Sequence, residues 1–110
     1  MTKKLNEDFV YLEEMYNDNY YPNFLVDKIK DCIVEVVEFL EKEDYKDLKE
    51  VQEKLDEMTE KINDLQDVFD ENGSEIETVA RDSIGVTVEK ILEYFEIDID
   101  MEEAIREREW

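Results

Sequence analysis

The feature that most constrains the fold is an unbroken row of apolar residues in the middle of the chain. Its members recur at alternating intervals of three and four residues: Leu48, Val51, Leu55, Met58, Ile62, Leu65 and Phe69. This spacing places them on one side of an α-helix and predicts a long helix over about residues 44–72. Because such a seam is stable only when it is covered, a second long helix must lie along it, either in the same chain or in a second copy.

The same periodicity continues on both sides of this segment. It predicts helices over about residues 4–17, 22–42 and 74–97, and a short helix that begins at Asp100. Only two glycines and one proline occur among the 110 residues, which leaves few turns and disfavours a sheet. We therefore expect one all-α domain over residues 1–110, an antiparallel bundle of four main helices plus a short C-terminal helix.

Local signals mark the ends of these helices. Pro22 suits the first turn of the second helix, and Gly73 suits the position just after the long helix. Ser74 and Glu77 have the spacing of a capping box, in which each side chain bonds the other residue's backbone N–H. Gly85 lies inside the fourth helix, where it indicates a kink or the close approach of another helix.

The balance of charge restricts the partners. The chain carries 34 acidic and 13 basic side chains, a formal net charge of −21, which repels nucleic acid and anionic lipid and attracts a basic protein surface. No apolar run approaches the ~18 residues of a membrane span, and the residues after Met1 lack the apolar segment from which we would expect a signal peptide. The single cysteine, Cys32, cannot form an internal disulfide. We therefore expect a cytoplasmic protein that has neither a nucleic-acid nor a membrane partner.

The chain has no histidine, which removes histidine-based acid–base catalysis and most zinc sites. We accordingly name no catalytic residue and no cofactor. One carboxylate pattern stays open, because Glu35, Glu38, Glu53 and Asp56 are similar to the paired acidic motifs of the all-helical nucleoside triphosphate pyrophosphohydrolases. That resemblance implies Mg²⁺ or Mn²⁺ between facing helices. In a chain with 34 acids, however, pairs of this kind arise by chance.

Two further groups of residues are candidates for binding. Glu77 and Arg81 are four residues apart and can pair on one helix face, where Asn63 and Asp64 can join them in a small polar site. The alternative is an ordinary salt bridge.

The second group contains Tyr20 and Tyr21, which lie beside acidic residues at a break between helices. In composition this segment is similar to the binding faces of the small acidic immunity proteins that neutralise nuclease colicins. The alternative is that the rings pack over helix ends with their hydroxyls in water. Trp110 either docks on the bundle or anchors a partner.

Several of these residues also belong to one longer pattern. It comprises Tyr21-Pro22 with Leu25 to Lys28, Asn63 to Gln66 with Phe69, Gly73 to Asp82, Arg108 and Trp110. In these residues the chain resembles a small bacterial family catalogued as a domain of unknown function. The resemblance implies no activity, substrate or cofactor. It does point to candidate site residues: Asp27, Lys28, Asn63, Asp64, Glu75, Glu77, Arg81, Asp82 and Trp110.

Three functions are compatible with the sequence. The favoured one is an acidic protein-interaction module, of the inhibitor or immunity type, for a basic partner. The second is a structural homodimer formed through the seam at residues 48–69. The third is a magnesium-dependent hydrolase that uses the four carboxylates named above.

Overall fold

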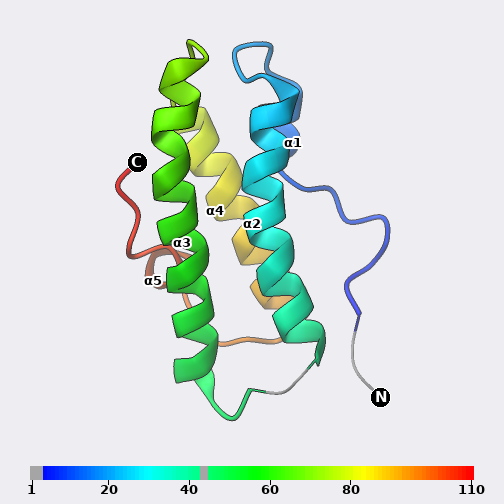
Figure 1. Cartoon of the computed structure of the whole chain (residues 1–110). Coiled ribbons are helices and arrows are strands. Elements are labelled where there is room, and N and C mark those ends of the chain that lie inside the picture. Colours follow the sequence, from blue (N-terminus) through cyan, green and yellow to red (C-terminus); the bar gives the residue numbers. More distant parts are fainter. Residues whose placement is uncertain (1–3, 43–44) are drawn as a thin grey trace.

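Three long helices dominate the computed structural model, which describes residues 4–42 and 45–110 (Figure 1). Over these residues the chain forms helices and no strand: α1 (Glu13–Tyr16), α2 (Asn23–Lys42), α3 (Leu48–Glu71), α4 (Thr78–Tyr94) and α5 (Met101–Ala104). In Figure 1, α2 descends, α3 returns alongside it and α4 descends behind the pair. The fold is all-helical, as predicted.

The long seam is covered from within the chain. α3 packs along α2 more extensively than any other two helices pack in the described structure. Most of the predicted seam is buried in this contact: Val51, Leu55, Met58, Ile62 and Phe69. The partner helix is therefore α2 of the same chain, and Leu48, in the first turn of α3, is the seam residue that stays exposed.

The N-terminal segment departs from the prediction. Helix forms only at Glu13–Tyr16, and residues 4–12 are irregular, so the helix expected over residues 4–17 was wrong for most of its length. Leu12 has a left-handed backbone (φ 51°, ψ 43°), and its N–H donates to Oγ1 of Thr87 in α4 at 3.1 Å. Leu12 and Met15 are fully buried, so this segment contributes side chains to the core without forming a continuous helix.

The connection between α3 and α4 also differs. As predicted, Gly73 follows the end of α3, and its φ of 72° allows the Ser74 N–H to donate to the Phe69 carbonyl at 2.9 Å. The capping box was wrong, because α4 begins at Thr78 and its N-cap, Glu77, makes no side-chain capping bond. The Ser74 hydroxyl instead donates to the carbonyl of Tyr20 at 3.2 Å.

The prediction for Gly85 is confirmed. This glycine is buried in α4, and a Cβ built on it would lie 3.1 Å from Sδ of Met101. The close approach is therefore made by α5, which contacts both α3 and α4. Within residues 4–42 and 45–110, no helix has the length and apolar character needed to cross a membrane.

Candidate functional site

Two connections meet at one end of the molecule, which we call the upper end (Figure 1): residues 17–22 before α2 and residues 72–77 before α4. Asp18 shapes the first connection, because its side-chain Oδ1 accepts from the Tyr20 N–H at 2.9 Å and its carbonyl accepts from the Tyr21 N–H at 3.1 Å. The bond from Ser74 to the Tyr20 carbonyl ties the second connection to the first. The structure thus brings together residues that are 54 positions apart in the sequence.

The two tyrosines at this end have different environments. Their rings meet edge to face at 5.1 Å, but Tyr21 is only 3% exposed whereas Tyr20 is 42% exposed. The Tyr21 ring is therefore part of the core, which agrees with the packing alternative for the ring but not with a hydroxyl in water. Tyr20 faces solvent, and partial desolvation together with the negative charges of Glu77 and Glu75 raises the pKa of its hydroxyl. The exposed ring of Tyr20 is thus held close to two carboxylates.

A groove lies between α3 and the connection that precedes α4. It has a volume of about 290 Å³ and is lined by Gln66, Asp67 and Asp70 of α3 and by Glu75 and Ile76 of the connection. We call it the acidic groove. In the described part of the chain, no three Asp, Glu, Cys or His side chains are grouped closely enough to hold a metal ion. Three of the five residues that line the groove are acidic, so its lining is negatively charged.

A second opening lies between α4 and the residues of α5. This arginine pocket has a volume of about 300 Å³ and is lined by Arg81, Asp82, Val86, Met101, Glu102, Ile105 and Arg108. Arg81 donates from Nε to the main-chain oxygen of Trp110, the last residue of the given sequence, at 3.2 Å. Its predicted side-chain pairing with Glu77 does not form in the described structure, where Glu77 is the N-cap of α4 and has an extended backbone.

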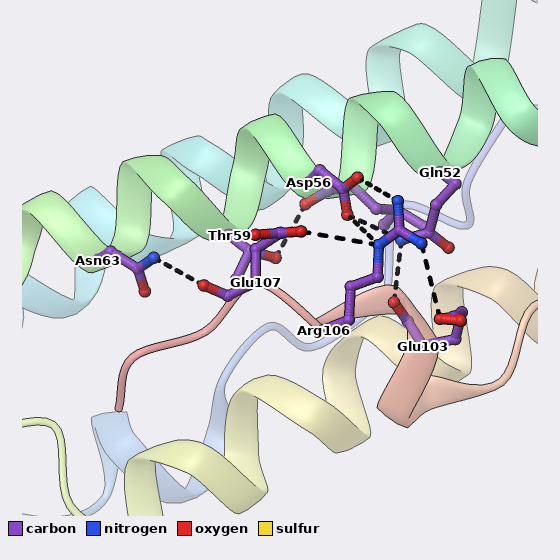
Figure 2. Close-up of polar contacts among 8 residues, drawn as sticks. Gln52, Asp56, Thr59, Asn63, Glu103, Arg106 and Glu107 are labelled. Atoms are coloured by element: carbon purple, nitrogen blue, oxygen red, sulfur yellow. Dashed lines mark hydrogen bonds and ion pairs between the residues drawn. The ribbon is translucent and has the colours of Figure 1, made fainter.

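Asn63 has a defined role, which is to hold the C-terminal segment, residues 100–110, on α3 (Figure 2). Its Nδ2 donates to the Glu107 carbonyl at 2.9 Å, and its Oδ1 accepts from the Glu109 N–H at 2.9 Å. Gln52 acts similarly lower on the same helix, where Nε2 donates to the Glu103 carbonyl at 2.9 Å. Trp110, at the end of the C-terminal segment, is only 8% exposed. Of the two alternatives for this residue, docking on the bundle or anchoring a partner, its burial agrees with the first.

Asp56 completes this row of polar side chains. Arg106 meets it with two parallel bonds, from Nε to Oδ1 at 3.1 Å and from Nη2 to Oδ2 at 2.8 Å (Figure 2). Burial alone would raise the pKa of Asp56, but the hydrogen bonds from Arg106 and Gln52, with the charge of Arg106, bring it below its usual value. Asp56 is thus an ion-pair partner within the fold.

The four carboxylates of the metal hypothesis do not meet. Asp56 is bound by Arg106, and Glu35 pairs with Lys61 at 2.8 Å. Glu38 and Glu53 are exposed on α2 and α3, beside openings that Lys54 also lines. Lys54 lies beside Glu38 and Glu53, and Asp56 is already paired with Arg106. The four carboxylates therefore do not form the cluster that Mg²⁺ or Mn²⁺ requires.

The remaining candidates do not join either opening. Asp27 accepts a hydrogen bond from the Tyr16 hydroxyl at 2.5 Å, and this bond, after burial, contributes to raising the pKa of Tyr16. Lys28 and Asp64 are exposed on α2 and α3. These three residues are therefore surface or structural positions in this structure.

Sequence reasoning missed several lining residues. Asp67 and Asp70 form an acid pair on α3, but such pairs are too common in this chain to attract attention. Val86, Met101 and Ile105 lie outside the main apolar stripes. Arg81 is the one signal that indicates the second opening, because it is the only arginine before the C-terminal segment in a chain whose other basic residues are ten lysines and two arginines.

Comparison with known proteins gives one result. Residues 5–110 match a family described as a family of unknown function, DUF5713. No curated protein and no solved structure matches the chain. The match covers the irregular N-terminal segment, all five described helices and the C-terminal segment. The chain therefore belongs to this family of unknown function.

Proposed function

We propose that the upper end of the molecule binds a basic segment of a partner protein. The observation that carries the proposal is the placement of Tyr20: its ring is 42% exposed, and Glu75 and Glu77 lie close enough to perturb its hydroxyl. Glu75 also lines the acidic groove, so the same carboxylate influences the Tyr20 hydroxyl and borders the groove. An aromatic face beside carboxylates favours the guanidinium or ammonium group of a partner.

Apolar side chains at the same end support a protein partner in preference to a small cation. Phe24 is 51% exposed in the first turn of α2, and Val79 is 44% exposed in the first turn of α4. Both helices begin at the upper end (Figure 1). Aromatic anchors within a charged rim are the usual composition of a protein-binding surface.

The charge of the whole chain supports the same conclusion. A net charge of −21 produces a long-range field that accelerates the encounter with a basic partner and is screened by salt. Neutralisation of a basic protein by an inhibitor or immunity-type protein is the specific role that this combination favours. We place the interaction in the cytoplasm, which is compatible with a single, buried cysteine.

A crosslinking experiment tests the proposal. A photoreactive phenylalanine analogue replaces Tyr20 in one version of the protein and Val10, an exposed apolar residue of the N-terminal segment, in another. At low salt in the native lysate, we expect the Tyr20 position to capture a basic protein that the Val10 position does not. If the Tyr20 position captures no basic protein at low salt, the proposal is wrong.

A pair of charge reversals separates local recognition from general charge. Glu75→Lys with Glu77→Lys alters the upper end, whereas Glu89→Lys with Glu93→Lys changes the net charge equally on exposed positions of α4. We expect the first double variant to lose the crosslinked partner and the second to retain it. Equal losses in the two would show that only the total charge matters.

The other two candidate functions have less support. The side chains of the seam at residues 48–69 are already buried against α2, so a homodimer through this seam would have to open the fold. The hydrolase requires carboxylates that the described structure keeps apart.

A further inference from the structure

One asparagine of the chain, Asn72, is followed by a glycine, and the pair lies exposed at the end of α3. Because glycine has no side chain, the backbone nitrogen of Gly73 is less shielded than that of any residue with a Cβ. A Cβ built at Gly73 would meet no atom within 4 Å apart from its chain neighbours, so the position is open to water. The other asparagines all precede larger residues: Asn6, Asn17, Asn19, Asn23 and Asn63.

An asparagine and the glycine after it can react with each other, which is one reason that asparagine is thermolabile. The Gly73 nitrogen attacks Cγ of Asn72 and loses its proton, the side-chain nitrogen leaves as ammonia, and a succinimide ring closes. Water then cleaves one of the two ring bonds to the Gly73 nitrogen. Cleavage at Cγ gives aspartate, and cleavage at the main-chain carbonyl gives isoaspartate. The balance is one water consumed and one ammonia released, so no further reactant is needed.

The folded backbone keeps the two reacting groups apart. With a ψ of 16° at Asn72, the Gly73 nitrogen nearly eclipses the Asn72 nitrogen and is turned away from the side chain. The Gly73 N–H donates to the Asp70 carbonyl at 3.1 Å, and Nδ2 of Asn72 donates to the Val68 carbonyl at 2.8 Å. Ring closure therefore requires rotation about the Cα–C bond of Asn72 and the loss of these bonds, which means that the end of α3 must open first.

Ser74 restrains this opening. Its N–H donates to the Phe69 carbonyl at 2.9 Å and its buried side-chain hydroxyl donates to the Tyr20 carbonyl at 3.2 Å. A rotation at Asn72 displaces the residues that follow, so both bonds of Ser74 must break when the end of α3 opens. The contact that joins the two connections of the upper end therefore also protects Asn72 from reaction.

We propose that Asn72 is a site of spontaneous deamidation whose rate is set by local opening of the end of α3. Either product adds a negative charge two residues after Asp70, which lines the acidic groove. The isoaspartate product also inserts a methylene group into the main chain before Gly73, which changes the register of the bond from Ser74 to Phe69. The modification thus remodels the connection before α4. The proposal does not depend on the function proposed for the upper end.

Peptide mass mapping measures the reaction with an internal control, because trypsin releases residues 62–81 as one peptide that contains both Asn63 and Asn72. The full chain is incubated at mildly alkaline pH, in buffer and in urea above the unfolding midpoint, and fragmentation assigns the modified position. Because deamidation is slow compared with opening, its rate in buffer follows the population of the open state. In urea we expect Asn72 to react faster than Asn63, and in buffer we expect Asn72 to react about tenfold more slowly than in urea, or slower still.

Two serine variants locate the opening. Ser74→Ala removes the bond to the Tyr20 carbonyl, and we expect the rate at Asn72 in buffer to rise about two- to tenfold while the rate in urea stays the same. Ser83→Ala is the matched control, since Ser83 is a buried serine of α4 whose hydroxyl donates to Oε2 of Glu14 at 3.2 Å, and we expect it to leave both rates unchanged. Asn72→Gln should abolish the modification of this position.

Several results would overturn the proposal. If Asn72 reacts no faster than Asn63 in urea, the site does not exist. Equal rates at Asn72 in buffer and in urea would show that the end of α3 does not control the reaction. An unchanged rate in Ser74→Ala, or an equal increase in Ser74→Ala and Ser83→Ala, would refute local opening as the controlling step. None of these results depends on whether the upper end captures a partner.

Discussion

Replacement of Asn63 by alanine tests whether the C-terminal segment contributes to stability. The variant loses the two hydrogen bonds to the backbone of Glu107 and Glu109, both 2.9 Å long. Each such bond contributes about 0.5–1.5 kcal/mol, which gives about 1–3 kcal/mol for the pair. Because the freed backbone groups are at the surface and can bind water, we expect the lower part of this range, about 1–2 kcal/mol.

A neighbouring substitution provides the reference. Alanine favours a helix more than asparagine does, by up to about 0.7 kcal/mol, which masks part of the loss. Asp64→Ala, at the next position of α3, brings a comparable gain in helix propensity without breaking a hydrogen bond of the described structure. The difference between the two variants therefore isolates the contribution of the two bonds. At ~0.5 M salt the change of charge in Asp64→Ala is largely screened.

Urea unfolding followed by circular dichroism and by Trp110 emission measures this difference. In thermal unfolding the same loss should lower the midpoint by roughly 4–8 °C per kcal/mol for a domain of this size. If Asn63→Ala and Asp64→Ala agree within about 0.3–0.5 kcal/mol, the bonds to the C-terminal segment contribute nothing and the reasoning is refuted.

Two further predictions concern other polar contacts. Thr87→Val removes the acceptor of the Leu12 N–H while keeping the shape of the side chain, and should lower the free energy of unfolding by about 1–3 kcal/mol. Thr87→Ser keeps the hydroxyl and should lower it less. Calorimetry that finds the valine variant as stable as the parent would contradict this prediction. Asp56 has a pKa below its usual value of about 3.9, so its contribution to stability is complete above that value and is lost as the pH falls through the lower pKa of the folded state. We therefore expect the stability difference between the parent and Asp56→Asn to be constant from about pH 7 to pH 5 and to shrink below about pH 4. Urea midpoints across that range provide the measurement, and a difference that grows at acid pH would be the contrary result.

Periodicity predicted the long helices because burial on one face decides their formation. The seam from Val51 to Phe69 is buried as expected, and α2 and α3 begin within about four residues of the predicted positions. Gly73 was also predictable, since a left-handed residue after a helix is usually glycine. These features depend on local sequence and on a partner helix that the chain itself supplies.

The errors arose where a distant residue changed the local preference. The spacing of Leu5, Phe9, Leu12 and Tyr16 is helical, but the bond from Leu12 to Thr87 holds a backbone that interrupts the helix. Ser74 has a capping sequence, but its hydroxyl reaches Tyr20 instead. Neither partner could be found from nearby residues, because 75 and 54 positions respectively separate them.

The candidate site was predictable in part. Tyr20, Glu75 and Glu77 were named from the sequence, and the structure brings them together at the upper end. Arg81 and Asp82 were also named, but two of the apolar residues that line their pocket, Met101 and Ile105, come from α5 and the residue after it. No local pattern relates those residues to α4, so that part of the pocket required the fold.

The left-handed turn at Leu12 has a consequence for the order in which the molecule assembles. A buried leucine in this conformation is unfavourable by itself, at about 1–2 kcal/mol, and the hydroxyl that satisfies its N–H belongs to a helix far along the chain. The backbone around Leu12 therefore cannot be stabilised in its final conformation until α4 has formed and packed against it. Folding kinetics should show this as a contact that is absent at the barrier, so that Thr87→Val accelerates unfolding and leaves the folding rate almost unchanged.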